Sequence, residues 1–488
     1  MNLQQLISTC LVKNDVSSLD SLTITSITQY IDEVRSGSLF ICIHNSYYDG
    51  HDFIQEALSQ GATAIVVAKL PPYPGPFILV ANTERALAQI AADYYGHPSR
   101  GIRFIGVTGT NGKTTTTVLI DRILAYAGYN SGLIGTLYNR IGQDFLPTPN
   151  TTPHTVELQQ LLRQMATAEV TDCVMEVSSH GLKQDRVLGI DFHVAVFTNF
   201  TQDHLDFHPD MDDYYQSKSR LFSRLGNRFG HTAKMAVINI DDPIGPQLVA
   251  LTPVNTLTYG CGQGDLQALD ISTSAKGTSY TLSLFGKHYP LRTRLIGDFN
   301  VYNILAAFGA AYAIGISPET IICALTDIEG VPGRFEIVTT NNNITSIVDF
   351  AHSPDGLLTV LQTARSLTKG KLFCVMGCSG NRDISKRPIM AQIAVDHADH
   401  VFFTTNNPRK EDPQQIIRHM IAGLNAPNYS LQKNRKLAIR EALSMAQPGD
   451  IVLVAGMGPR AYDDDGLNQM ITDREAIQTI TQAKTLSN

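Results

Sequence analysis

The segment GVTGTNGKTTTT at residues 106–117 constrains the fold more than any other part of the sequence. It joins the apolar run FIGVT, through a glycine-rich turn, to TTTVLIDRILAYAG, whose apolar residues recur at helical spacing, so it predicts a strand, a tight loop and a helix. Backbone amides in such a loop bind phosphate, and its lysine and hydroxyl reach the terminal phosphates and Mg²⁺. We therefore predict a nucleotide site formed by Gly109, Thr110, Asn111, Gly112, Lys113, Thr114 and Thr115.

Strand and helix patterns alternate along most of the chain and predict an α/β protein. At 488 residues the chain is too long for a single core. Breaks rich in Gly and Pro, GHPSRG and EGVPGRFE, divide it into predicted domains of residues 1–98, 99–331 and 332–488. We expect a central doubly wound sheet with the P-loop, flanked by a small α/β N-terminal domain and a Rossmann-like C-terminal domain.

Short apolar runs give the positions of individual strands. They lie at residues 39–43, 64–68, 173–177, 194–200 and 235–240 in the first two domains, and SIVDFA, LFCVMG, HVFFTT and DIVLVAG follow in the third. Residues 252–298 are rich in Thr, Ser, Gly and Tyr, which predicts an antiparallel excursion.

Composition and charge exclude several classes of function. A net charge of -7 and a pI near 6.0 give no basic field that would gather nucleic acid or an anionic membrane. The seven cysteines lack CxxC spacing and indicate reduced thiols. The N-terminus MNLQQLISTCLVKND has no basic lead, and no apolar run approaches the length of about 18 residues that a membrane span needs. We expect a cytoplasmic monomer, without membrane insertion, that acts on small molecules.

Charged side chains follow two further predicted strands. Glu176 ends CVMEV, and TNFTQDHLDFH at residues 198–208 supplies Asp203 and His204 after the next strand. Ligands bind at the carboxyl ends of parallel strands, where a carboxylate and an imidazole near a triphosphate can hold divalent ions. Each cluster alone is also compatible with a solvated loop, but their place beside a P-loop favours a metal site.

With GTNGKTT, EVSSHGL and TNFTQDHLDFH in this order, the chain resembles the Mur ligase family, and most closely its MurE branch. The likeness extends to GDFNVYNILAA, PGRFE, DFAHSPD, GCSGNRDISKRPIM and NNPRKEDP. It implies an ATP-dependent, ADP-forming acid–amino-acid ligase that works through an acyl-phosphate. The implied reaction adds meso-diaminopimelate to UDP-MurNAc-L-Ala-D-Glu during peptidoglycan synthesis.

The resemblance also assigns roles to residues around the nucleotide. Lys113, Glu176, His204 and Lys218 become the catalytic set, and Asn300, Arg334 and Asp349 become further contacts to ATP. Two Mg²⁺ ions would be held by Thr114, Glu176, His204 and Lys218. Lys218 matches a lysine that the family carries as a carbamate formed with CO₂, whereas the sequence without this resemblance favours an exposed helix lysine.

Two substrate pockets follow from the same matches. The carboxylate donor would contact Asn150, Thr151, Thr152, Ser178, Gln184 and Arg186. The acceptor amino acid would contact Arg387, Asn406, Asn407, Arg409, Gly456 and Arg460. Alternatively, the two threonines form a turn or helix cap and Arg186 belongs to a surface ion pair.

Three departures from the family pattern affect the substrates. Ile31 stands where a serine would contact uridine, Asn406 replaces an aspartate, and Arg460 stands where a glutamate would bind the far ammonium group of the acceptor. An acid in DDDG at residues 463–466 would restore that contact, although such a segment is more typical of a solvated acidic turn. The alternatives are a related ligase for another amine or acid, for instance in secondary metabolism, and a nucleotide-binding scaffold without turnover.

Overall fold

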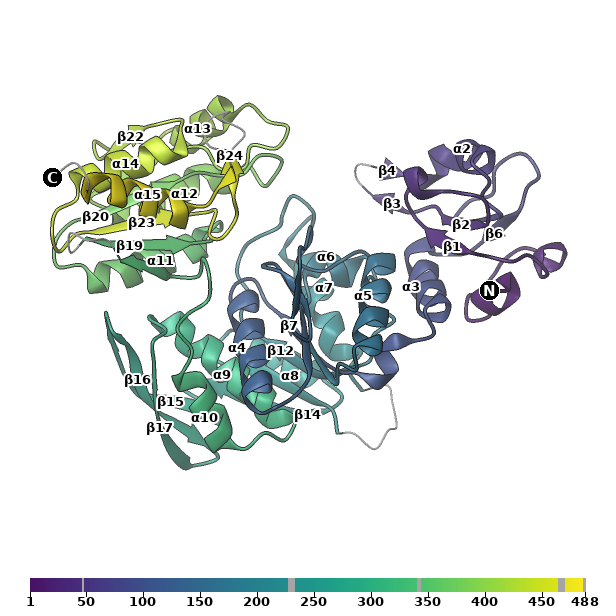
Figure 1. The fold of residues 1–488 in the computed structure, drawn as a ribbon, viewed down its shortest axis with the longest axis horizontal. Helices are drawn as coiled ribbons and strands as arrows, with labels where there is room; N and C mark the ends of the chain where they lie inside the picture. The colour runs from purple at the N-terminus through teal and green to yellow at the C-terminus, as the bar shows by residue number, and fades with distance from the viewer. Residues whose placement is uncertain (46–47, 227–232, 340–343, 464–469, 486–488) are drawn as a thin grey trace.

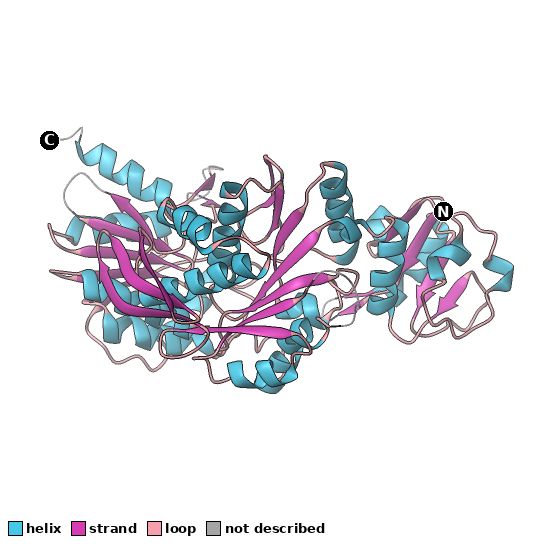
Figure 2. Ribbon diagram, turned by 90° about the horizontal axis from the view of Figure 1, so that it is seen from below, coloured by secondary structure: helices cyan, strands magenta, loops and turns pink. Residues whose placement is uncertain are grey.

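The computed structural model describes residues 1–45, 48–226, 233–339, 344–463 and 470–485. These residues form three units, each built on its own main sheet (Figure 1). The purple N-terminal unit and the yellow-green C-terminal unit lie at opposite ends, with the blue to green central unit between and below them. Figure 2 shows helices packed against the strands of each unit, so the α/β class predicted from the sequence is confirmed.

The N-terminal unit is a small parallel sheet covered by helices. Its strand order is β1-β2-β5-β6. The strands are β1 Ser26–Thr28, β2 Ser38–Ile41, β5 Ala64–Val67 and β6 Phe77–Leu79, and a short hairpin pairs β3 His44–Asn45 with β4 Tyr48–Asp49. The helices are α1 Leu3–Ile7, α2 Ile54–Ser59 and α3 Thr83–Tyr94, with short 3₁₀ turns at Ser17–Leu19, Ile31–Glu33, Gly50–Phe53 and Pro98–Gly101. Every residue of β2 and β5 is buried, as expected for a parallel sheet covered on both faces.

The central unit contains an eleven-stranded sheet in the order β10-β9-β8-β11-β7-β12-β13-β14-β15-β16-β17. Its strands are β7 Arg103–Thr108, β8 Ser131–Ile134, β9 Asn139–Ile141, β10 Asp144–Leu146, β11 Asp172–Glu176, β12 Phe192–Phe197, β13 Met235–Asn239, β14 Asn255–Gly260, β15 Leu266–Ser274, β16 Gly277–Leu284 and β17 Lys287–Thr293. The strands from β8 to β14 in this order are parallel. The antiparallel excursion predicted at 252–298 is confirmed by the pairing of β15 with β16 and of β16 with β17, whereas β14, in the same range, is parallel to β13 and β15.

Helices cover both faces of this sheet. They are α4 Lys113–Tyr126, α5 Thr155–Thr167, α6 Ser179–Lys183, α7 Met211–Ser223, α8 Gly245–Leu251, α9 Asp298–Ala313 and α10 Pro318–Thr326. One core joins α4, α9 and α10 to the sheet, and a second core joins α5, α7 and α8 to the opposite face. Because the parallel strands all point the same way, the loops that follow them gather at one edge of the sheet.

The C-terminal unit repeats this arrangement with the strand order β18-β19-β23-β20-β21-β22. Its strands are β18 Glu336–Thr339, β19 Thr345–Asp349, β20 Leu372–Met376, β21 His400–Phe403, β22 Tyr429–Leu431 and β23 Ile451–Ala455, and a hairpin pairs β24 Tyr462–Asp463 with β25 Met470–Ile471. The helices are α11 Pro354–Leu367, α12 Lys386–His397, α13 Pro413–Ile421, α14 Arg435–Met445 and α15 Asp473–Thr485. Only β18 runs antiparallel to its neighbour in this six-stranded sheet.

All seven cysteines are free thiols. Within the described ranges, none of the helices has the length and apolar character needed to cross a bilayer.

Candidate functional site

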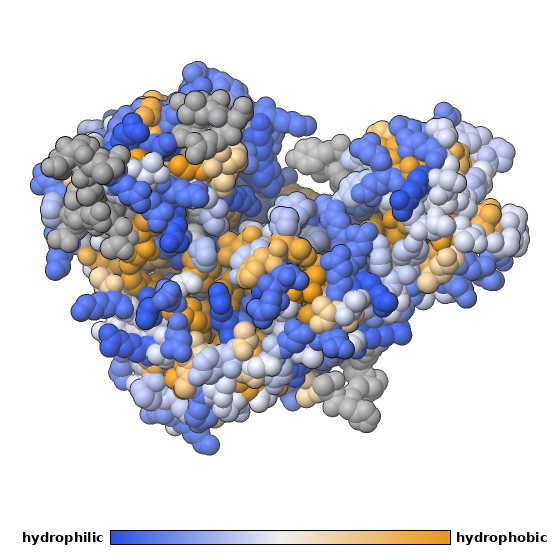
Figure 3. All heavy atoms as spheres, viewed as in Figure 1, coloured by the Kyte–Doolittle hydropathy of each residue, from blue (hydrophilic) through white to orange (hydrophobic). Residues whose placement is uncertain are grey.

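A cavity of about 520 Å³ lies where the central and C-terminal units meet. The central unit contributes the glycine loop after β7, the loops after β8, β11 and β12, and parts of α7 and α9. The C-terminal unit contributes the loops after β19, β20, β21 and β23. Figure 3 shows the surface hollowed between the C-terminal unit at upper left and the other two units, with hydrophilic residues on the side of the C-terminal unit that faces the hollow.

The glycine loop has a shape that only glycine permits at two positions. Gly109 and Gly112 have φ values of 152° and 85°. A Cβ atom would lie 1.8 Å from Thr198 Oγ1 at Gly109 and 2.3 Å from Asn303 Oδ1 at Gly112. Asn111 is fixed as well, since its backbone N–H donates to Asn199 Oδ1 at 2.8 Å. The loop is therefore pre-shaped before any phosphate binds.

Two lysines meet beneath this loop. Lys113 Nζ donates to the carbonyls of Gly109 and Thr110 at 2.8 and 2.9 Å, and Lys218 Nζ donates to the Gly109 carbonyl at 2.7 Å. Burial lowers the pKa of Lys113, although Glu176 and Asp203 oppose the shift. Lys218 is 2% exposed, and burial together with Lys113 lowers its pKa well below the ordinary value. Lys218 is thus no exposed helix lysine, and its environment favours the neutral amine.

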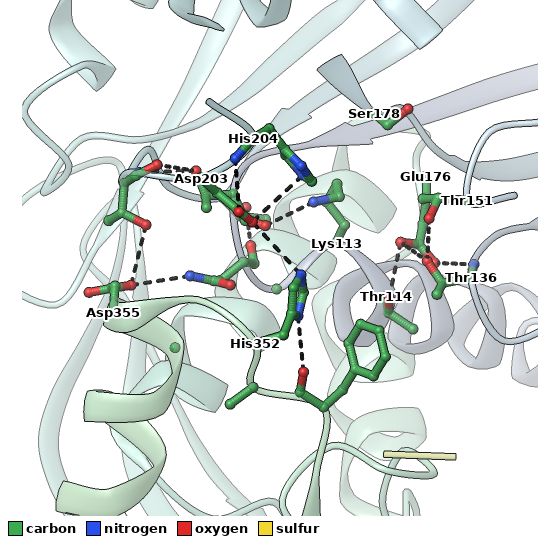
Figure 4. A pocket seen from close by; sticks show the side chains of 18 of the residues that line it. Lys113, Thr114, Thr136, Thr151, Glu176, Ser178, Asp203, His204, His352 and Asp355 are labelled. Atoms are coloured by element: carbon green, nitrogen blue, oxygen red, sulfur yellow. Dashed lines mark hydrogen bonds and ion pairs between the residues drawn. The ribbon is translucent and has the colours of Figure 1, made fainter. Parts of the chain in front are cut away.

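Glu176 organises the opposite side of the loop. Its carboxylate is 1% exposed and accepts hydrogen bonds from the Thr114 hydroxyl at 3.0 Å and from the backbone N–H and hydroxyl of Thr136 at 2.7 and 3.0 Å. Figure 4 shows these side chains turned toward one another at the start of α4. Arg334 Nη2 also donates to the Thr114 hydroxyl, at 2.9 Å, and so links the segment before β18 to the glycine loop.

Asp203 lies at the junction of the central and C-terminal units. Its carboxylate is 3.3 Å from Lys386 Nζ and 3.8 Å from His352 Nε2, both of the C-terminal unit, and 3.6 Å from His204 Nε2 (Figure 4). Burial opposes ionisation, but these neighbours outweigh it and hold the pKa of Asp203 below its usual value. A second link joins Asn111 Nδ2 to Asp355 Oδ2 at 3.1 Å. The C-terminal unit therefore contacts the glycine loop and the loop after β12 through polar groups.

The metal prediction depends on oxygen ligands that the chain alone does not supply. Among the described residues, no group of three or more His, Cys, Asp or Glu side chains is placed to hold a metal. The cavity does bring together the Thr114 hydroxyl, the Glu176 carboxylate and the His204 ring. Burial lowers the pKa of His204 well below the ordinary value despite Asp203, so the ring is a neutral donor. This donor set fits Mg²⁺ when phosphate oxygens complete the shell.

The residues predicted for the donor form a polar wall. Asn150, Thr151, Thr152, Ser178 and Arg186 line the cavity. Thr152 is 1% exposed, and its hydroxyl donates to the Glu176 carbonyl at 2.8 Å and accepts from the Ser178 N–H at 3.0 Å. Gln184 does not line the cavity, because its Oε1 accepts from Arg186 Nε at 2.9 Å and so orients that guanidinium instead.

The residues predicted for the acceptor divide into two groups. Arg409, Gly456 and Arg460 line the cavity, whereas Asn406 and Asn407 do not. Asn406 Nδ2 donates to the Gly377 carbonyl at 3.2 Å, and Asn407 Oδ1 accepts from the Arg409 N–H at 3.1 Å. The two asparagines therefore shape the turn that presents Arg409.

Arg387 and Asn300 are placed differently from the prediction. The Arg387 side chain is fully buried behind the cavity wall, where Nη2 lies 2.9 Å from Glu411 and 3.2 Å from the Ser379 carbonyl. Asn300 is 3% exposed, and its Nδ2 donates to the Ile296 carbonyl at 2.8 Å. One helical turn later, Asn303 lines the cavity in its place. Neither Arg387 nor Asn300 lines the cavity in this structure, and their contacts to the acceptor and to ATP stay predictions.

Several cavity residues were missed by sequence reasoning. They are Thr136, Asn303, His352, Asp355, Arg382 and Lys386. Most of them lie within motifs that the resemblance singled out, but their individual side chains had no distinguishing pattern. Of the DDDG acids, Asp463 does not line the cavity, and Asp464 and Asp465 lie outside the described residues.

Comparisons with known proteins extend over nearly the whole chain. Models described as Mur ligase middle domain and as Mur ligase, glutamate ligase domain match residues 107–311 and 333–458. A Bacillus velezensis protein named UDP-N-acetylmuramoyl-L-alanyl-D-glutamate--2,6-diaminopimelate ligase is 46% identical over 457 residues, 93% of each chain. A solved structure of a ligase with that name is 30% identical, with a TM-score of 0.69 over 99% of each chain. The crystal structure of MurF ligase from Thermotoga maritima in complex with ADP is 19% identical, with a TM-score of 0.63 over 97% of this chain and 100% of that one, and shows a shared fold alone.

Proposed function

This chain belongs to the Mur ligase family, and we propose that it uses ATP to join diaminopimelate to UDP-N-acetylmuramoyl-L-alanyl-D-glutamate. The observation that carries the proposal is one cavity bounded by the phosphate-binding loop, the polar donor wall and the arginine-bearing loops of the C-terminal unit. A ligase that activates a carboxylate and then delivers an amine needs these three regions to adjoin. Because its nucleotide-linked substrates belong to the cell interior, we place the reaction in the cytoplasm.

The proposed chemistry has two steps. A carboxylate oxygen of the donor attacks the γ-phosphorus of ATP, and ADP leaves. The acceptor amine then attacks the acyl carbon of this acyl-phosphate, and inorganic phosphate leaves as the amide forms. Lys113 binds the phosphates of ATP, and Arg186 with Ser178 orients the donor.

Mg²⁺ is proposed as the metal, held by Thr114, Glu176, His204 and carbamylated Lys218. When bound, it neutralises the charge of the transferring phosphoryl group. The lowered pKa of Lys218 supports the carbamate, because the neutral amine is the form that captures CO₂ and the product replaces a repelled cation with an anionic oxygen ligand.

A related ligase for a different carboxylate donor is the second candidate. Ile31 favours it, since this side chain packs against the core around Val34 and Phe40 and has no group that donates a hydrogen bond to uridine. Release of phosphate from ATP, measured with each substrate omitted in turn, distinguishes the two. Release that requires both UDP-MurNAc-L-Ala-D-Glu and meso-diaminopimelate supports the first proposal. ATP binding without release under any amine rejects it and leaves the second donor or a scaffold without turnover.

A further inference from the structure

The turn that presents Arg186 to the donor wall ends helix α6 with a left-handed aspartate. The Arg186 N–H donates to the Gly181 carbonyl at 2.9 Å, and the Asp185 N–H donates to the Leu182 carbonyl at 3.3 Å. These two bonds form a Schellman turn, in which Asp185 has a φ of 49°. Glycine usually takes this position, because a side chain makes the left-handed conformation less favourable. The contacts of the Asp185 side chain therefore have to compensate for this cost.

Three guanidinium groups surround the carboxylate of Asp185, which is 3% exposed. Arg224 Nη1 donates to Oδ1 at 2.9 Å, and Arg220 Nη1 lies 3.9 Å from the same oxygen. Arg85 Nε lies 3.6 Å from Oδ2. Arg220 lies on α7 and Arg224 directly follows that helix, whereas Arg85 lies on α3 of the N-terminal unit. The carboxylate therefore joins the turn after α6 to two other helices, one of which belongs to another unit.

Further polar contacts fix the end of α6 against α7, and the two helices lie side by side (Figure 1). Arg220 Nη1 donates to the carbonyls of Leu182 and Lys183 at 3.2 and 3.1 Å, and so satisfies carbonyls that the end of the helix leaves open. Lys183 Nζ lies 2.7 Å from Asp213 Oδ2, also on α7. Because α7 carries Lys218 as well, the turn after α6 is anchored to the helix that supplies the buried lysine of the cavity.

The residues on either side of Asp185 belong to the donor wall. Gln184 Oε1 accepts from Arg186 Nε at 2.9 Å, and Arg186 Nη1 donates to the Thr152 carbonyl at 2.8 Å. Arg186 lines the cavity, whereas Asp185 does not. Since Asp185 lies between Gln184 and Arg186 in the chain, a shift of its backbone would move both side chains. The ion pairs of Asp185 therefore fix the direction of the Arg186 guanidinium, on which pairing with a carboxylate depends.

We propose that Asp185 is a positioning residue for the carboxylate donor, because its paired carboxylate holds the turn that points Arg186 into the cavity. This inference rests on the proposed ligase function, in which Arg186 orients the donor. Asp185 acts through Arg186 and does not itself touch the substrate. Loss of its charge would weaken the binding of the donor and leave the sites for ATP and the acceptor, which other loops form, as they are.

The substitution Asp185→Asn tests the inference. Asparagine has nearly the same shape and also tolerates the left-handed conformation, so the change removes little besides the charge that pairs with the arginines. In phosphate-release assays, the KM for UDP-MurNAc-L-Ala-D-Glu is expected to rise by about tenfold. The kcat and the KM values for ATP and diaminopimelate are expected to stay within about twofold of those of the unmodified protein.

The substitution Arg224→Gln removes the closest partner of Asp185 from the other side. The Arg224 side chain is 34% exposed, so the fold tolerates its replacement more readily than a change at the buried carboxylate. The KM for the donor is expected to rise by about threefold or more. Because both substitutions break the same pair, the double variant is expected to have a donor KM within about twofold of that of Asp185→Asn alone. Effects on the donor KM that multiply in the double variant would contradict a role through this pair.

The substitution Asp172→Asn is the matched control. Asp172 is 1% exposed, and its Oδ1 lies 2.5 Å from Arg103 Nε, so the change breaks an ion pair with a comparably buried carboxylate. Asp172 begins β11, however, at the opposite end of the strand from Glu176 and the cavity. The control is expected to lower the midpoint of thermal unfolding, as Asp185→Asn does, and to leave the KM for the donor unchanged.

The failures are distinguishable. If the unmodified protein uses this donor and folded Asp185→Asn keeps the same donor KM, the inference is overturned while the proposed function stands. An equal rise of the donor KM in Asp172→Asn overturns it as well, because the effect would then follow from lost stability alone. If Asp185→Asn does not fold, the donor KM of Arg224→Gln decides in the same way. If the unmodified protein releases no phosphate with this donor, the proposed function fails and the inference fails with it.

Discussion

The Arg435 guanidinium and the Asp473 carboxylate form a two-pronged ion pair in the core of the C-terminal unit. Nε and Nη2 of Arg435 each lie 2.7 Å from a carboxylate oxygen, and the side chains are 2% and 0% exposed. The same guanidinium donates to the carbonyls of Ala455 at 2.9 Å and Thr405 at 3.4 Å. These carbonyls begin the two loops that carry Arg460 and Arg409, so the pair connects both loops to the start of α15.

The substitution Asp473→Asn is expected to lower the free energy of unfolding by about 3–5 kcal/mol, because it leaves a buried guanidinium without its counterion. It is also expected to raise the KM for the acceptor more than the KM for ATP. Urea denaturation and phosphate release measure the two effects. The control Arg294→Gln breaks an exposed pair with Glu329 and is expected to cost less than about 1 kcal/mol. Equal rises in both KM values would contradict the positioning role.

The glycine loop gives a second test. Gly112→Ala places a Cβ atom 2.3 Å from Asn303 Oδ1 at a φ of 85°, and the loop must shift to accept it. ATP binding measured by calorimetry is expected to weaken by about tenfold or more, since the backbone amides no longer converge on the phosphates. Gly96→Ala is the matched control, because Gly96 has a φ of 74° and no atoms within 4 Å of the added Cβ. Equal ATP affinity in the two variants would show that the loop tolerates the displacement.

Lys218 provides a third test. Lys218→Met keeps much of the side-chain length but cannot form a carbamate, and it is expected to lower kcat by about 100-fold or more. In the unmodified protein, ¹³C-labelled bicarbonate is expected to give a carbamate carbon signal that Lys218→Met lacks. The control Lys276→Met changes an exposed lysine and should retain both the signal and the activity. A labelled signal that persists in Lys218→Met would place the carbamate on another residue.

The main elements of the fold follow from the sequence because each leaves a local pattern. The run from Phe104 to Thr108 is apolar and the helix after it is periodic, so β7 and α4 could be placed without tertiary information. The antiparallel strands β15 to β17 were also recognisable from their composition. These elements could be predicted because the pattern that specifies each of them lies within its own residues.

The individual site residues are harder to predict from the sequence than the strands and helices, because packing sets the direction in which a side chain points. Asn300 and Asn303 lie one turn apart on α9, yet only Asn303 reaches the cavity. Neighbours on α12 differ in the same way, since Lys386 lines the cavity while Arg387 turns toward Glu411. The motif matches assigned roles to Asn300 and Arg387, whereas Asn303 and Lys386 are the members that line the cavity in this structure.

Contacts between units are harder still to predict. Asp203 and His352 are far apart in the sequence and come within 3.8 Å only because the C-terminal unit packs against the loop after β12. Neither residue has a local pattern that names its partner.

The folded state is expected to be sensitive to acid because of His154, which precedes α5. Its ring lies edge-on to the ring of Tyr30 in the N-terminal unit, with 6.1 Å between the two ring centroids. Burial, followed by the charge of Arg186, lowers the pKa of His154 to about 4. The pKa of histidine in an unfolded chain is about 6.5, so between pH 6.5 and pH 4 the unfolded chain binds a proton that the folded protein does not. The free energy of unfolding is therefore unaffected by this group above pH 6.5 and decreases as the pH falls from 6.5 toward 4. His352, whose pKa is also lowered to about 4 by burial, acts in the same direction.

The variant His154→Asn removes this ionisable group and is expected to flatten the loss of stability below pH 6.5, by up to about 1.4 kcal/mol per pH unit. Urea denaturation at several values between pH 8 and pH 4.5 measures the slope. The capping contact from the residue 154 backbone N–H to Glu157 at 3.2 Å does not depend on the imidazole, so the helix start should persist in the variant. Parallel stability curves for the variant and the unmodified protein would show that His154 binds a proton equally well in both states, which would require the ring to be accessible to water in the folded protein.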